Sequence, residues 1–200
     1  MAVVSGSECR LFIRGLSGSA EDSNIEAIVD QVNPVIARYL GWPLMSAGVY
    51  SLSSGTYVVY LTGDHSKRLD LPLIPVTAIT SIYDDPDLAY TDDADLVAAS
   101  DYVLYGNEGI VMLKHDSTHG HWTSVERAIK VTMTAGFSSI PQEIKQAIGL
   151  QVAHIWQGRD HVGRSKVTQG GGSIEVASLA LLPEVKELIA PWRMGSSWIG

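Results

Sequence analysis

The stretch RAIKVTMTAGFSSIPQEIKQAIGLQVAHIWQGRD, residues 127–160, joins a predicted strand to a predicted helix and decides the fold. Ile129, Val131 and Met133 alternate with polar residues, which is the two-residue period of a strand buried on one face. Gly136 then supplies the backbone freedom for a sharp exit from that strand. The stretch carries no catalytic motif, which favours a role in assembly over a role in turnover.

A helix is predicted to follow, beginning at Pro141. A proline in the first turn loses only an N–H that has no partner within the helix, and Ser138 or Ser139 is near enough to cap that turn. The apolar residues that follow share one helical face, and they are Ile144, Ala147, Ile148, Val152, Ile155 and Trp156. Polar residues occupy the other face, so this helix is expected to lie on a core.

Another amphipathic helix is predicted earlier in the chain, over residues 23–41. Ser23 and Glu26 match a capping box, and Pro34 is expected to kink the helix because its ring crowds the preceding turn. The predicted apolar face consists of Ile25, Ile28, Val29, Val32, Val35, Ile36, Tyr39 and Leu40.

The segment between these helices changes to the composition of strands. Runs rich in β-branched and aromatic residues, separated by Gly, Ser, Asn and Asp, occupy 49–52, 57–61, 69–74, 76–83, 102–105 and 110–113. Residues 106–109, Gly-Asn-Glu-Gly, predict a hairpin turn.

The predicted fold class is α+β. A small core of three main helices carries a large β-rich insertion between its first and second helices, with extended arms at both ends. The last helix is predicted from about Leu182 or Pro183 to Ala190, and Leu11, Phe12 and Ile13 of the first arm are expected to dock or to pair as an edge strand. The predicted segments are an arm at 1–22, a helical core at 23–44 and 136–191, an insertion at 45–135, a flexible loop at 158–172 and a tail at 192–200.

The strand, its Ala-Gly-Phe turn and the proline-initiated helix resemble the head-tail connector proteins of tailed bacteriophages, also called adaptor or head-completion proteins. Two further segments resemble the same family. The first helix ends in an aromatic-Leu-Gly turn at 39–41, and residues 71–82 match Leu-Pro-x-x-Pro-Val-x-x-Ile-x-Ser-Ile. The known family is largely helical, so the β-rich insertion departs from its minimal pattern.

The resemblance implies a structural virion protein that is not an enzyme and needs no cofactor. By this resemblance, such an adaptor forms a ring of 12 copies that matches the symmetry of the portal above it. The ring extends the DNA channel and links the capsid to the tail. The implied partners are the portal, the next neck or tail protein, further copies of the chain and packaged DNA that passes without sequence-specific binding. The implied location is the neck of the virion, after assembly in the host cytoplasm. A stopper or a tail terminator is the alternative neck component.

The composition agrees with assembly in a reducing compartment. The 200 residues are 46% hydrophobic, enough for a sizeable core, and the single cysteine, Cys9, permits no internal disulfide and is expected to be inert. The formal net charge of −8 argues against a protein that binds nucleic acid through the electrostatic potential of its whole surface, because such binding needs clustered Lys and Arg. No signal peptide and no membrane-spanning run is expected, and no membrane partner.

Two charged segments are candidate functional surfaces. The acidic one contains Asp84, Asp85, Asp87, Asp92, Asp93 and Asp95. It lacks the central Gly and distal Glu of an EF-hand, so we expect a like-charged rim facing DNA or a complementary rim facing a neighbouring subunit. The basic one contains Arg159, Arg164 and Lys166, which form either a solvated loop or a contact with DNA or an acidic partner.

A cluster of histidines supports a rival hypothesis. His115, Asp116, His119 and His121 lie within seven residues, and a hairpin could aim two imidazoles and a carboxylate at one metal. A small metal-dependent enzyme using His115, His119 and His121 is therefore the alternative from another class. The spacing matches no recognised zinc pattern, which favours a polar loop with titrating histidines.

The end of the chain is the candidate portal contact, comprising Trp192, Arg193, Met194, Trp198 and Ile199. Trp198 lies among Gly and Ser with little local core to join, and buried Trp often dominates interfaces. The resemblance also implies that this end of the chain contacts the portal, because adaptors of this type bind the portal through a C-terminal extension.

Overall fold

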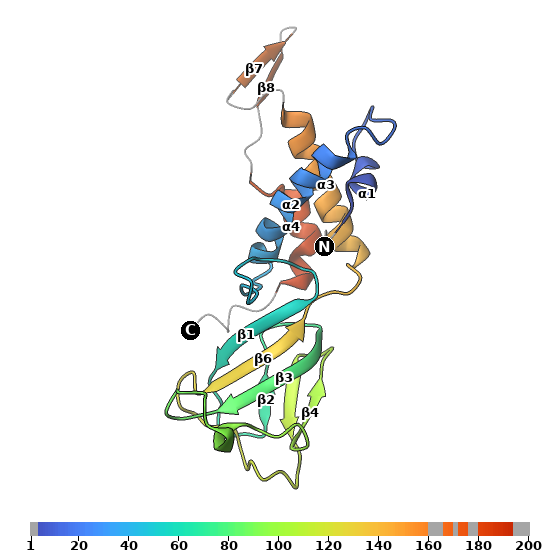
Figure 1. Ribbon diagram of the computed structural model, residues 1–200. Coiled ribbons are helices and arrows are strands. Elements are labelled where there is room, and N and C mark those ends of the chain that lie inside the picture. The colour runs from blue at the N-terminus through green and yellow to red at the C-terminus, as the bar shows by residue number, and fades with distance from the viewer. Residues whose placement is uncertain (1–3, 160–165, 170–171, 176–179, 194–200) are drawn as a thin grey trace. The chain divides into compact units, whose positions relative to one another are not determined.

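The computed structural model describes residues 4–159, 166–169, 172–175 and 180–193 (Figure 1). The chain divides into two compact units. Unit 1 is built from the described residues of Met1–Gly41 and Ser139–Arg193, and unit 2 from those of Trp42–Ser138. Unit 1 is mainly helical and unit 2 contains antiparallel sheets, so the predicted α+β class is confirmed.

The first long helix of unit 1, α2, spans Asp22–Tyr39. Its buried face confirms the predicted helix, except that Val35 is 42% exposed. The predicted capping box is wrong. The helix begins one residue before Ser23, so Ser23 and Glu26 both lie inside its first turns, and the N-cap residue Glu21 makes no side-chain capping bond. Pro34 lies within α2, which continues on both sides of it.

Helix α3, Gln142–Gly158, confirms the helix predicted after the decisive strand. The expected apolar stripe is buried except for the half-buried Ile155, and Gln151 joins it with an exposed fraction of 1%. Pro141 is the N-cap residue with extended backbone, not part of the first turn, and no serine caps the helix.

Residues expected to form an extended N-terminal arm contain helix α1, Gly6–Arg10. Ser5 and Glu8 form a capping box there, each satisfying a backbone N–H of the first turn, which is why so short a helix forms. Of the apolar residues beyond it, Ile13 is buried and Leu11 is 83% exposed. Ile13 therefore docks, as one alternative predicted, while Leu11 does not, and residues 11–13 do not form an edge strand.

The C-terminal part of unit 1 contains α4, Pro183–Ile189, followed by the single turn η3, Ala190–Trp192. The buried Gln151 accepts a hydrogen bond from the Leu182 amide at 3.0 Å, which ties the start of α4 to α3. Within and just after the predicted loop at 158–172, the described residues of β7, Lys166–Gln169, pair antiparallel with β8, Gly172–Glu175, and residues 160–165 and 170–171 lie outside the described residues.

Unit 2 contains a first sheet in the order β1-β6-β3, with β1 spanning Gly55–Leu61, β6 Ile129–Ala135 and β3 Val76–Asp84 (Figure 1). The central strand β6 buries every second residue, as its period predicts. Gly136 has φ +110°, and a Cβ there would lie 2.5 Å from the Ser53 carbonyl oxygen, so the exit requires glycine.

The second sheet has the order β2-β5-β4, with β2 spanning Arg68–Asp70, β5 Ile110–Leu113 and β4 Tyr102–Tyr105. The β4–β5 hairpin has the predicted bounds and turn. The strand predicted at 69–74 ends at Asp70, as part of β2. The strand predicted at 49–52 does not form. Buried side chains of both sheets and the fully buried Trp122 form the core of unit 2.

Candidate functional site

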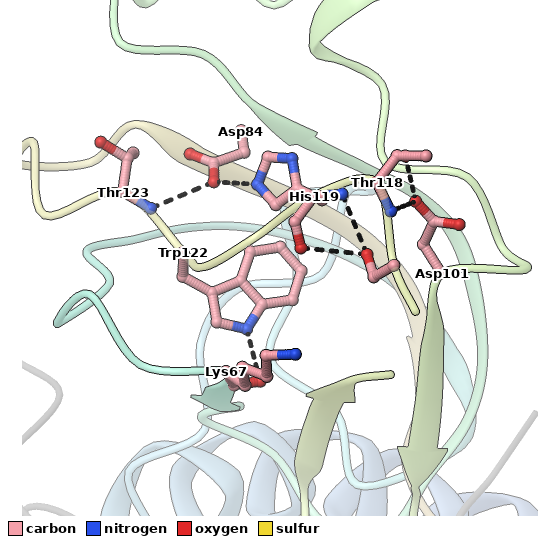
Figure 2. Close-up of polar contacts among 8 residues, drawn as sticks. Lys67, Asp84, Asp101, Thr118, His119, Trp122 and Thr123 are labelled. Carbon is pink, nitrogen blue, oxygen red and sulfur yellow. Dashed lines mark hydrogen bonds and ion pairs between the residues drawn. The ribbon is translucent and has the colours of Figure 1, made fainter. Parts of the chain in front are cut away.

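The histidine-rich loop between β5 and β6 is fixed to the end of β3 by a buried carboxylate (Figure 2). The Nε2 atom of His119 lies 2.5 Å from Oδ2 of Asp84, and the Thr123 amide donates to the same oxygen at 3.1 Å. The Asp84 side chain is only 2% exposed. Its other oxygen, Oδ1, is buried without a hydrogen-bond partner among the described residues.

Two further contacts hold the same loop. The indole N–H of Trp122 donates to the Lys67 carbonyl oxygen at 3.1 Å, and the Thr118 hydroxyl donates to Asp101 at 2.6 Å (Figure 2). The Asp101 carboxyl has a pKa below its ordinary value, chiefly because of that hydroxyl. The loop is therefore attached to β3, to the residues before β2 and to the residue before β4.

These contacts give His119 a structural role in fixing the loop. His115 is exposed, and the His121 ring faces His65 at a centroid distance of 5.0 Å. Within the described ranges, no three His, Cys, Asp or Glu side chains gather in a way that could hold a metal ion. The Nε2 atom of His119 is hydrogen-bonded to Asp84.

The acidic segment divides into an internal part and an exposed part. Asp84 and Asp85 are buried, with exposed fractions of 6% and 2%, so the expectation that they lie on a charged rim is wrong. Asp85 accepts hydrogen bonds from the amides of Asp87, Ala89 and Tyr90. The Tyr90 amide is the largest cause of a lowered pKa for Asp85. Asp85 thus organises the turn after β3.

The rest of the acidic segment remains a candidate rim. Asp87, Asp92 and Asp93 are exposed and Asp95 is half-buried. Asp92 also caps the single turn η1, Asp93–Asp95. Burial raises the pKa of Asp95 most, and repulsion from neighbouring carboxylates raises it further. The rim therefore consists of these four side chains, which we call the acidic rim.

A second surface cluster was missed by sequence reasoning. It consists of Tyr60, Tyr83, Tyr90, Arg127 and Lys130, and we call it the aromatic–cationic cluster. Sheet register aligns Tyr60, Lys130 and Tyr83 across three strands, and the Lys130 ammonium lies 5.9 Å from the Tyr83 ring centroid. Arg127 lies 5.2 Å from the Tyr60 ring centroid, and Tyr60 is 40% exposed. Tyr and Arg often dominate interface energies, so this cluster is a candidate contact surface.

The predicted basic residues are only partly described. The Arg159 guanidinium lies 3.8 Å from the Trp156 ring centroid, so it stacks on its own helix. Arg164 lies outside the described residues, and Lys166 is the first residue of β7. The structure therefore does not bring the three together as one site.

The predicted portal-binding residues divide at Arg193. Trp192 is half-buried in η3, and the Arg193 guanidinium lies 5.1 Å from the Tyr39 ring centroid of α2. Both residues thus belong to unit 1. Met194, Trp198 and Ile199 lie outside the described residues.

Comparison with known proteins places the chain in a family. No curated protein matches it closely enough to serve as a relative. In the part of the chain that the structure describes, no helix is long and apolar enough to cross a membrane. A model of the family described as head completion protein matches residues 3–195, which includes both units. This family is a structural one of the phage virion and is not a known family of enzymes. The chain therefore belongs to the head completion protein family, as its strand, turn and helix motifs predicted.

Proposed function

We propose that this head completion protein is a head-tail adaptor that forms a ring under the portal, extends the DNA channel and joins the capsid to the tail. The ring contains 12 copies, matching the portal, and assembles in the host cytoplasm. The observation that carries the proposal is the family match, because it covers both units and almost the whole chain.

The structure supports a division of labour in this adaptor. In unit 1, α3 packs against both α2 and α4, and these helices supply the subunit core. Unit 2 carries the acidic rim and the aromatic–cationic cluster, which provide charge and anchor residues for contacts with neighbouring subunits or with the next neck or tail protein. The function is binding without turnover.

The acidic character of the chain suits a channel for DNA. The net charge of −8 gives the protein a negative electrostatic potential that repels DNA phosphates. This repulsion favours the passage of DNA over its binding to the channel wall. The exposed Asp87, Asp92 and Asp93 are the described members of the rim that would contribute most to this repulsion.

The test is to mix the protein with purified portal and image the product. We expect one ring of density added to the portal and a stoichiometry of one chain per portal subunit. The protein alone is expected to sediment as a monomer, because contacts that are weak singly become strong once subunits are held side by side. Stable free rings would contradict the template requirement. Binding to a tail-side protein but not to portal would instead identify a stopper or tail terminator.

A further inference from the structure

The β7–β8 hairpin forms a two-stranded sheet of its own among the described residues. In the described part of the chain its two strands pair only with each other, and each is four residues long. Val167 is the register partner of Ile174, so the hairpin carries one pair of β-branched apolar residues. A two-stranded hairpin by itself is marginally stable in water and gains stability from a third strand or a packed face.

Strand β4 is an edge strand of the second sheet. It has β5 on one side, and on the other side no described segment forms a ladder with it. Its outward residues Val103 and Tyr105 are 39% and 47% exposed, and their partners Met112 and Ile110 on β5 are half-buried. The outward face of an antiparallel sheet is usually polar, so this apolar face beside a free edge is unusual.

The other sheet edges in unit 2 are less accessible. The Val97 amide donates to the Ile82 carbonyl of β3 at 2.9 Å, and Leu96 forms a bridge with Tyr83, so chain already covers that edge. The Ser46 amide donates to the Thr56 carbonyl of β1 at 2.9 Å.

Strand β2 is protected in a different way. It has three residues, and the exposed ion pair of Arg68 and Asp70 charges its surface. Charged side chains on a short strand are a common protection against pairing. Beside β4, the Val76 amide donates to the carbonyl of Gly106, just past the end of the strand, at 2.9 Å. The four residues of β4 itself form no second ladder within the described residues, and they equal either hairpin strand in number.

We propose that the β7–β8 hairpin of one copy adds to the β4 edge of a second copy and extends its β2-β5-β4 sheet. Pairing of backbone groups would supply affinity, and the apolar hairpin pair would extend the face formed by Val103 and Tyr105. Each copy keeps its own β4 for one neighbour while its hairpin engages another. Such head-to-tail contacts form a ring when the rotation from one copy to the next closes, as it would on a portal of the same symmetry. This inference rests on the ring proposed above and names one of its subunit contacts.

The test uses disulfides that can form only between copies. In a Cys9→Ala background, chains carrying Gln169→Cys, which lies two residues from Val167 in β7 and so on the same face, are mixed with chains carrying Val103→Cys or Tyr105→Cys. The mixture is oxidised with portal present and, separately, at high protein concentration without portal. Chains carrying Thr80→Cys, exposed on the covered strand β3, replace the β4 variants as the matched control. We expect about tenfold more of the β4 disulfide than of the control, because docking raises the local concentration of the two thiols.

A second variant separates the contact from the ring. Val167→Pro removes an N–H from the hairpin ladder, and it is expected to abolish the disulfide while unit 1 melts as in the parent protein. A β4 disulfide at the control level in both arms overturns the inference, even where rings form on the portal. So does an intramolecular disulfide in a single chain carrying both substitutions. Absence of rings together with the expected disulfide at high concentration refutes the proposed function and leaves the contact standing.

Discussion

At the residue scale, one ion pair ties the first helix of the chain to α3. The Lys145 ammonium donates to Oε1 of Glu8 at 2.8 Å, and the Ser5 amide donates to Oε2 at 2.9 Å. The hydrogen bond from Lys145 is the largest cause that lowers the pKa of Glu8 to about 2. The Glu8 side chain is 46% exposed, so water weakens the pair and its contribution stays below about 1 kcal/mol.

This pair predicts a specific dependence of stability on pH. Because the folded pKa lies below the ordinary value of 4.5, the contribution of Glu8 is complete above that pH and is lost as pH falls towards about 2. Lys145→Met should therefore lower the free energy of unfolding at pH 7 and have a smaller effect at pH 2, as measured with urea. Lys186→Met, on exposed α4 surface, is the control and should show no such difference. Equal losses at both pH values would assign the effect to packing.

The Asp84–His119 contact predicts unequal roles for neighbouring histidines. His119→Ala removes a partner of a carboxylate that is only 2% exposed, which should cost about 1–3 kcal/mol. His121→Ala changes an exposed ring and should stay within about 0.5 kcal/mol. Thermal unfolding of both variants measures this, and similar melting temperatures would show that the loop is not fixed through Asp84.

Sequence reasoning placed these residues in a loop but could not pair them. Local patterns report periods of two to four residues, whereas Asp84 and His119 are brought together by the packing of β3 against a distant loop. The aromatic–cationic cluster was missed for the same reason, since it depends on the register of three strands.

At the element scale, the strongest local signals were the best predictors. β6 and α3 were predicted because their apolar residues repeat over seven and seventeen residues, respectively. Helix α1 was missed because five residues are too short for a period, although Ser5 and Glu8 carried a capping signal. The β7–β8 hairpin was missed because its glycine-rich surroundings indicated a loop.

Packing of the N-terminal segment on α3 depends on one glycine. A Cβ at Gly149 would lie 2.4 Å from a carbon of the Phe12 ring. Gly149→Ala should therefore displace the ring and lower stability, although alanine in a helix by itself gains about 1 kcal/mol over glycine. Gly158→Ala, with no neighbour within 4 Å, is the control and should be neutral or stabilising.

Chemical unfolding of a double-mutant cycle isolates this contact. In a Phe12→Ala background the added methyl group meets no ring, so Gly149→Ala should become stabilising by up to about 1 kcal/mol. If Gly149→Ala costs the same in both backgrounds, Phe12 does not pack against α3.

At the scale of the whole molecule, the predicted portal-binding residues divide between those the structure describes, up to Arg193, and those that it does not. Trp192 and Arg193 were both predicted to bind portal, but Arg193 lies over the Tyr39 ring and Trp192 is half-buried. Removing them would therefore disturb unit 1 as well as any contact. The clean truncation begins at Met194 and removes Trp198 and Ile199.

Removal of residues 194–200 should leave the melting temperature unchanged and weaken portal binding severely. Trp198 is the expected anchor, and losing one buried Trp costs about 2 to 4 kcal/mol, or roughly thirty- to a thousand-fold in affinity per subunit. Co-sedimentation with portal should rank Trp198→Ala close to the truncation, with Ser197→Ala as the matched control in the same tail. Avidity in a ring masks single changes, so the comparison belongs at subunit concentrations too low to fill the portal. Unchanged binding by a well-folded truncation would move the portal contact to another surface, and the aromatic–cationic cluster would be the next to test.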